Sequence, residues 1–260
     1  MKRNVLSFFD LTGKTAVVTG AGSGLGRAMA EAMGEAGARV ACVDIDAGRA
    51  RETSDKIRTL DVDSIFLACD VTSEKEVVEA FRSIVTEFGR VDILFNNAGI
   101  PGPNVQLHQV SLEEWNRVIS VDLTGIFLCA KEAVKIMLEQ RSGKIINTGS
   151  LWSFRGGFPL LPVPPYHAAK GGVISLTREM ALEYAKDGIT VNAIVPGFFD
   201  TNISTRLRDE NFYKAVVSSI PIGRVGMPED MKGTALFLAS EASDYLTGAA
   251  IPVDGGYMSK

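Results

Sequence analysis

The stretch Thr15-Ala-Val-Val-Thr19-Gly20-Ala-Gly22-Ser-Gly24-Leu-Gly26 decides the fold of this chain. Its first half is a short apolar run with β-branched residues, which is typical of a buried strand. Its second half is a glycine-rich turn that leads into a helical pattern. Such a turn lets backbone N–H groups approach a pyrophosphate at the positive end of the helix. The stretch therefore predicts a dinucleotide-binding strand–turn–helix unit.

The same alternation of strand and helix continues to the end of the chain. The predicted strands are Thr15–Thr19, Arg39–Asp44, Ser64–Ala68, Val91–Phe95, Lys144–Thr148, Thr190–Val195 and Ala250–Val253. Helices are predicted near 25–36, 47–60, 73–88, 111–139, 165–186 and 228–240. The strands are almost entirely apolar, which fits a parallel sheet buried on both faces. The pattern predicts an α/β fold with a single doubly wound sheet of seven parallel strands and helices on both faces.

The chain is predicted to form one dinucleotide-binding and catalytic domain over residues 1–260. No internal repeat, linker or low-complexity tract divides it, and its length suits a single α/β domain. The least regular part, Phe198–Pro221, breaks the alternation of strands and helices. We therefore expect a substrate lid over residues 198–221.

Composition excludes several classes of partner. The net charge of -4 and the lack of a basic run argue against nucleic-acid binding. No apolar run is long enough to cross a bilayer, so no membrane partner is expected. Cys42, Cys69 and Cys129 form no C-x-x-C pair, and no His/Cys cluster indicates a metal. They are interpreted as reduced thiols of a cytoplasmic protein.

Asp44 ends the second predicted strand, eighteen residues after Gly26. A carboxylate there can accept hydrogen bonds from both adenosine ribose hydroxyls and would repel a 2′-phosphate. Ile45 rather than an arginine follows it, so NAD is predicted over NADP. Two alternatives remain: Arg49 could reach a 2′-phosphate, or Asp44 could be an ordinary acid at a strand end.

Tyr166 and Lys170 are four residues apart in a predicted helix, so their side chains share one face. A lysine about 4 Å away can lower the pKa of a tyrosine enough to make it a general acid/base at neutral pH. Taken alone, the spacing is a weak signal and more often marks a surface lysine one turn after a half-buried tyrosine.

Together the motifs closely resemble those of the short-chain dehydrogenase/reductase family over nearly the whole chain. The matching pieces are Thr19-Gly-x-x-x-Gly24-x-Gly26, Asp70-Val71, Asn96-Asn-Ala-Gly99, Ser150, Tyr166-x-x-x-Lys170, Pro196-Gly197 with Thr201, and Val253-Asp-Gly-Gly256. The resemblance implies a Rossmann-type fold and reversible hydride transfer between a nicotinamide and a carbinol or carbonyl carbon.

The resemblance also implies roles for individual residues. Tyr166 would exchange the alcohol proton, Lys170 would tune Tyr166 and hold the nicotinamide ribose, and Ser150 would bind the substrate oxygen. Asp70 and Val71 would flank the adenine. The remaining implied cofactor residues are Gly20, Ser23, Gly24, Leu25, Gly26, Asp44, Asn97, Ala98, Gly99, Pro196, Gly197 and Thr201.

Two departures from the family pattern stand out. Asp122 occupies the place of a usual asparagine whose main-chain carbonyl holds a relay water. We expect Asp122 to keep the relay role, although its carboxylate could change the field on Lys170. The segment Phe158–Pro165 lengthens the interval between Ser150 and Tyr166 and carries four prolines. We expect it to form a pocket wall rather than a surface insertion.

The predicted function is an NAD-dependent dehydrogenase of secondary alcohols, or the reverse carbonyl reductase. The alternatives are an NADP-dependent carbonyl reductase and a catalytically silent nucleotide-sensing protein of the same fold. Trp152 and Phe198 are expected at the substrate together with Ser150 and Tyr166. Sugar acids and cyclic alcohols both remain candidate substrates. A homotetramer is expected because the helix over 165–186 carries more apolar residues than one face against a sheet requires.

Overall fold

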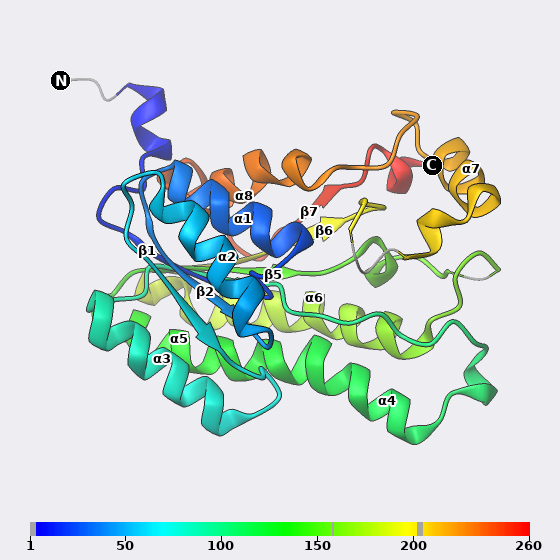
Figure 1. Cartoon of the computed structure of the whole chain (residues 1–260), viewed down its shortest axis with the longest axis horizontal. Helices are drawn as coiled ribbons and strands as arrows, with labels where there is room; N and C mark the ends of the chain where they lie inside the picture. The colour runs from blue at the N-terminus through cyan, green and yellow to red at the C-terminus, as the bar shows by residue number, and fades with distance from the viewer. Residues whose placement is uncertain (1–3, 158, 202–204) are drawn as a thin grey trace.

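The computed structural model describes residues 4–157, 159–201 and 205–260. One parallel sheet of seven strands, in the order β3-β2-β1-β4-β5-β6-β7, forms its centre (Figure 1). The strands are β1 Thr15–Thr19, β2 Arg39–Asp44, β3 Ser64–Ala68, β4 Ile93–Asn96, β5 Gly143–Thr148, β6 Ile189–Pro196 and β7 Ala250–Val253. The predicted fold class is confirmed.

Helices cover both faces of this sheet (Figure 1). One face carries α1 (Gly24–Glu35), α2 (Ala47–Arg58) and α8 (Lys232–Ala239); the other carries α3 (Glu74–Phe88), α4 (Leu112–Ile119), α5 (Gly125–Gln140) and α6 (Pro164–Tyr184). None of the helices in the described ranges has the length and apolarity needed to span a membrane.

The strands are apolar throughout because both of their faces are buried. In β1, Val17 packs with the layer of α3, α5 and α6, whereas its neighbour Val18 packs with the layer of α1, α2 and α8. Leu94 and Phe95 of β4 divide between the two layers in the same way. The core is therefore two apolar layers separated by the sheet.

Strand β4 begins two residues later than the predicted Val91–Phe95. The Asp92 side chain accepts a hydrogen bond from Thr15 N–H at 2.9 Å, and it pairs with Arg90. Val91 N–H and C=O both bond the Gln140 side chain. The Gln140 side chain satisfies both backbone groups of Val91, so backbone pairing with β1 and β5 begins only at Asp92, next to Ile93.

The helix predicted over 111–139 contains a π-helical turn at Ser120–Thr124 that joins α4 to α5. Asp122 lies in this turn and is fully buried. Turns of this kind are rare and frequently occur at functional sites, because they change the direction in which side chains point. The sequence pattern gave no sign of this turn.

The segment predicted as a lid is more regular than expected. It contains a 3-10 turn at Thr205–Arg208 and a helix, α7, at Glu210–Ser219, whose first turn is capped by the Asp209 side chain. Figure 1 places α7 beside the C-terminus. Residues 202–204 of the segment lie outside the described residues. Its role as a lid stays a prediction.

Candidate active site

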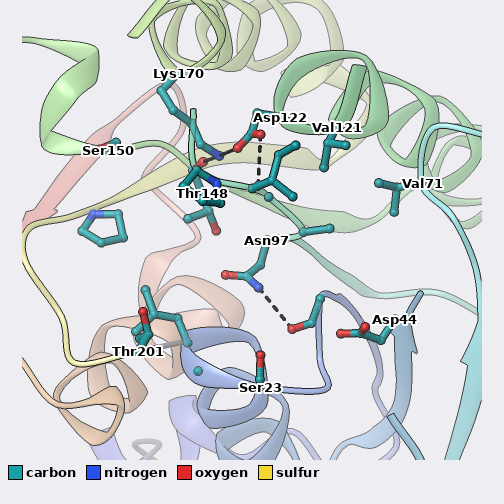
Figure 2. Close-up of a pocket in the computed structure, with 18 of the residues that line it drawn as sticks. Ser23, Asp44, Val71, Asn97, Val121, Asp122, Thr148, Ser150, Lys170 and Thr201 are labelled. Carbon is teal, nitrogen blue, oxygen red and sulfur yellow. Dashed lines mark hydrogen bonds and ion pairs between the residues drawn. The ribbon is translucent and has the colours of Figure 1, made fainter. Parts of the chain in front are cut away.

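A cavity of about 480 Å³ lies at the carboxyl edge of the sheet, where ligands bind in open α/β folds (Figure 2). The predicted site residues that line it are Gly20, Ser23, Gly24, Leu25, Asp44, Asp70, Val71, Asn97, Ala98, Gly99, Asp122, Ser150, Tyr166, Lys170, Pro196, Gly197 and Thr201. The glycine turn and the tyrosine–lysine pair, about 140 residues apart in sequence, therefore share one cavity.

Gly26 does not line the cavity. A Cβ atom placed on it would lie 2.0 Å from Gly20 O, so only glycine lets the first turn of α1 pack against the preceding loop. Gly26 therefore shapes the glycine turn through close backbone packing.

Trp152 and Phe198 do not line the cavity either. Their ring centroids are 5.9 Å apart, and both rings meet Tyr257 edge-on, at 6.3 Å from Trp152 and 5.5 Å from Phe198. Trp152 is buried, and it also contacts the ring of His167 at 5.4 Å. Phe199, the neighbour of Phe198, lines the cavity instead. A substrate role for Trp152 and Phe198 stays a prediction.

The glycine turn has the geometry that an anion requires. Gly20 and Gly24 have φ values of +66° and +53°, in the left-handed region that favours glycine. Ser23 makes no side-chain cap hydrogen bond to the N-terminus of α1, so that end of the helix offers backbone donors to the cavity. The turn thus fits the pyrophosphate of a dinucleotide.

Asp44 is fixed at one end of the cavity. Its Oδ2 accepts a hydrogen bond from Gly22 N–H at 2.8 Å, and its Oδ1 accepts one from Asp46 N–H at 3.0 Å. Each oxygen retains a lone pair for a further donor. Arg49 also lines this end and is ion-paired with Asp46 at 3.2 Å. The carboxylate is thus fixed in place and can accept further hydrogen bonds.

Asn97 and Asp70 shape the middle of the cavity. Asn97 Nδ2 donates to Thr19 O at 3.1 Å, which ties the end of β4 to the end of β1. Asp70 Oδ1 accepts hydrogen bonds from Thr72 N–H and from the Thr72 hydroxyl at 2.9 and 2.8 Å. Both residues keep the carboxyl edge of the sheet in a fixed shape, as expected for a cofactor wall.

Lys170 forms a buried polar cluster at the other end of the cavity (Figure 2). Its Nζ donates to Thr148 O at 2.9 Å and lies 3.3 Å from Asp122 Oδ1. The side chains of Lys170 and Asp122 are 3% and 0% exposed. The same Nζ lies 5.6 Å from the ring centroid of Tyr166. Thus one ammonium serves both an acidic partner and the phenol.

The carboxylate of Asp122 is held by one hydrogen bond, on Oδ2, and by one ion pair, on Oδ1. Ile100 N–H donates to Oδ2 at 3.1 Å, which turns Oδ1 toward Lys170. A Cβ atom at Gly99 would lie 2.7 Å from Oδ1, so the ion pair needs glycine there. Burial raises the pKa of Asp122, and the charge of Lys170 opposes this effect. The structure thus brings Asp122 to Lys170 through its side chain.

The pKa of Tyr166 is raised above its ordinary value. Burial is the largest cause, and the negative charge of Asp122 adds to it. The Lys170 charge and a hydrogen bond with Ser150 act in the opposite direction. The sequence-based expectation of a lowered pKa counted only the lysine, so the net direction in the structure is opposite to it.

None of the described residues of the proline-rich segment lines the main cavity. Among its described residues, Pro162, Val163 and Pro164 line a separate hollow of about 400 Å³ together with His167. Phe158, where the segment begins, lies outside the described residues. His167 Nδ1 is 3.0 Å from Val163 O, which supports a structural role for this histidine.

Some residues that line the cavity were not predicted from the sequence. These are Cys69, Ile100, Pro101, Val121, Thr148 and Gly149. Thr148 ends β5. Because ligands bind at the carboxyl ends of the strands, its position at a strand end could have identified it as a cavity residue. Arg155, which could have paired with a substrate, instead donates to the backbone oxygens of Tyr257 and Lys260 at 2.9 Å each.

Comparisons with known proteins show the family of this chain. Residues 20–258 match the model of a family described as enoyl-(acyl carrier protein) reductase. The 2-dehydro-3-deoxy-D-gluconate 5-dehydrogenase of Dickeya dadantii is 38% identical over 98% of this chain and 100% of its own length.

Two solved structures are also similar. A short-chain type dehydrogenase/reductase from Mycobacterium marinum superposes with a TM-score of 0.94 at 36% identity, covering 98% of this chain and 99% of that one. A gluconate 5-dehydrogenase from Burkholderia cenocepacia, in complex with NADP and tartrate, gives 0.93 at 33% identity, covering 99% and 100%.

Proposed function

Because this chain belongs to the short-chain dehydrogenase/reductase family, and so is an oxidoreductase that acts on CH–OH groups, we propose that it is an NAD-dependent dehydrogenase of secondary alcohols. The observation that carries the proposal is the single cavity that joins the glycine turn to Ser150, Tyr166 and Lys170. A nucleotide bound at the turn and an alcohol at Tyr166 would meet inside it.

The residues present fit a nicotinamide dinucleotide. The amides of the glycine turn would hold its pyrophosphate, Asp44 its adenosine ribose, and Asp70 with Val71 its adenine. Asn97 and the Pro196–Thr201 turn would line the nicotinamide half. The bound cofactor supplies the hydride acceptor, and the chain supplies placement and proton transfer.

Tyr166 would handle the proton. In alcohol oxidation its phenolate accepts the hydroxyl proton of the substrate, and in carbonyl reduction its phenol donates one. Ser150, which lines the same cavity as Tyr166, would position the substrate oxygen. Lys170 would orient the ribose, and the main-chain carbonyl of Asp122 would hold a relay water.

Oxidation assays test this proposal. Wild-type protein would be incubated with NAD and a panel of sugar acids, cyclic alcohols and steroids, with NADH followed by fluorescence. Sugar acids stand first because the relatives from Dickeya dadantii and Burkholderia cenocepacia are named for them. Turnover of at least one secondary alcohol is expected. Cofactor binding without turnover of any member would favour a silent nucleotide-sensing protein.

An NADP-dependent reductase is the second candidate, since the gluconate 5-dehydrogenase relative is in complex with NADP. Arg49 lines the same end of the cavity as Asp44 and could meet a phosphate. Asp44 favours NAD, because its fixed carboxylate would repel the 2′-phosphate.

We predict that Asp44→Ala erodes the preference for NAD. Loss of hydrogen bonds to a charged acceptor should lower kcat/KM for NAD about tenfold to a hundredfold, while use of NADP improves. Steady-state kinetics with both cofactors would measure this. Asp55→Ala is the matched control, since it removes another exposed carboxylate of α2 that pairs with Arg58 and does not line the cavity. Equal use of NAD and NADP by wild type would show that Asp44 does not select the cofactor.

We also propose a homotetramer, on different residues from those the sequence suggested. Val173, Ile174 and Met180 are already buried within the chain. Phe127 on α5 and Leu182 on α6, by contrast, are 48% and 79% exposed. Helices α5 and α6 belong to the layer opposite α1 and α8 (Figure 1), and a second copy packed on this layer would cover these side chains.

Light scattering at micromolar concentration should give about four times the chain mass of 27.9 kDa. Phe127→Glu together with Leu182→Glu should lower the assembled mass, because charges would enter the interface. A wild-type mass of one chain would contradict the proposal.

The cytosolic location expected from the sequence is supported by three buried free thiols, Cys42, Cys69 and Cys129, which suit a reducing compartment.

A further inference from the structure

Asp122 and Lys170 form a buried ion pair directly beside the proposed acid/base. A buried charge is costly unless it is paired and hydrogen-bonded. Here the carboxylate meets Lys170 Nζ at 3.3 Å and Ile100 N–H at 3.1 Å, while the ammonium also bonds Thr148 O. The local structure therefore holds Asp122 against Lys170.

The backbone makes room for this carboxylate. The π-helical turn at Ser120–Thr124 carries Asp122 toward the end of β4, where Gly99 lacks the side chain that would collide with Oδ1. Two local features, the π turn and the absence of a side chain at Gly99, thus allow the contact between Asp122 and Lys170. The contact at Gly99 concerns the carboxylate itself, so it supports a role for the Asp122 side chain beyond its main-chain carbonyl.

We propose that Asp122 is a positioning residue that neutralises Lys170 and so keeps the Tyr166 phenol protonated, which favours carbonyl reduction at neutral pH and moves alcohol oxidation to more alkaline pH. This inference rests on the proposed function. Unpaired, the ammonium would stabilise a phenolate at Tyr166; paired, its field at the phenol is opposed by the carboxylate. Burial is the main cause of the raised Tyr166 pKa, the charge of Lys170 lowers this pKa, and the charge of Asp122 counteracts the lysine.

Other charges near the cluster are few in the described part of the chain. The π turn and α6 pack against α4, whose titratable side chains are Glu113, Glu114 and Arg117. On α6, His167 follows Tyr166 directly, and its Nδ1 faces Val163 O. Helix α5, which also packs against the π turn, carries Lys131, Glu132, Lys135 and Glu139. The turn at Leu151–Ser153 and strand β6 carry no charged residue. Arg117 favours the ionised form of Asp122.

Asp122→Asn tests the role, because it removes the charge while keeping nearly the same shape. Wild type and variant would be compared at saturating NAD and alcohol over pH 6 to 10, each normalised to its own maximal kcat. We expect the rising limb of oxidation to move to lower pH, so that the normalised rate below the limb increases about tenfold. Carbonyl reduction needs the protonated phenol, so as the pH rises the variant should lose this activity at a lower pH than wild type does.

Further variants separate charge from structure. Asp122→Ser removes the same charge with a smaller side chain and should move the limb in the same direction, which provides the test if the asparagine variant folds poorly. Asp122→Glu keeps the charge and should stay near wild type. Asp92→Asn is the matched control, since Asp92 is also buried and ion-paired but lies at the opposite end of β4. Its limb should not move.

An unmoved limb in both neutral variants, or a limb that moves equally in Asp122→Glu, would overturn the proposal. NADH titration by fluorescence would confirm that each variant still binds cofactor. A wild type that turns over no alcohol would defeat the proposed function itself. A wild-type limb that is present but insensitive to Asp122 would defeat only the role of this residue.

Discussion

Tyr166→Phe should lower kcat by about a thousandfold, the order of magnitude that general acid/base catalysis supplies. The substitution removes only the hydroxyl that exchanges a proton, and the ring can keep its place at the cavity edge. Binding of NADH should therefore stay close to wild type. Steady-state rates at saturating NAD, together with a fluorescence titration of NADH, would measure both quantities.

A neighbouring aromatic residue provides the control for Tyr166. Tyr257 packs edge-on against Trp152 and Phe198 but does not line the cavity. Tyr257→Phe keeps the ring and removes a hydroxyl of the same kind, so its kcat should fall far less. Substantial turnover by Tyr166→Phe would defeat the mechanism.

Replacement of Lys170 should cost both activity and stability. Lys170→Met keeps the chain length but leaves Asp122 as a buried carboxylate without its cation, which typically costs about 3–5 kcal/mol. We expect kcat to fall by orders of magnitude, NAD binding to weaken and Tm to drop by roughly 10 °C. Calorimetry and steady-state kinetics would measure these changes.

A double variant separates the two effects. Lys170→Met combined with Asp122→Asn removes both charges, so much of the lost Tm should return, while activity stays low because Tyr166 and the ribose still lack the ammonium. Lys170→Arg keeps a charge but differs in shape and hydration, so it should recover little. Full activity in the double variant would show that Lys170 serves only the fold.

The sequence predicted the sheet well because its signal is local. Strands β1, β2, β3 and β7 begin and end where their apolar runs do. The start of β4 could not be located in this way, since it depends on Asp92 and Gln140 bonding backbone groups from distant positions. The helix α7 was missed although Asp209 caps it, because the surrounding segment breaks the alternation of strands and helices.

The residues of the candidate site could be predicted where a sequence motif marks them. They could not be predicted where their position depends on packing between distant parts of the chain. The glycine turn, Asp44 and the tyrosine–lysine spacing all lead to the observed cavity. The contact between Asp122 and Lys170 joins residues 48 positions apart, so its geometry required the fold. Trp152 was expected at the substrate but packs in an aromatic cluster instead. The sequence could not separate the two outcomes, because an aromatic side chain near a site suits a pocket wall and a packed cluster equally well.

The most direct test is single-turnover oxidation of one secondary alcohol at saturating NAD, followed by NADH absorbance across pH in wild type and Tyr166→Phe. The wild-type rate constant should rise toward alkaline pH in a single-proton step, because oxidation needs the phenolate and the pKa of Tyr166 is raised by burial. The residual rate of Tyr166→Phe should lack that step. The same step persisting in the variant would assign the titrating proton to another group and contradict Tyr166 as the acid/base.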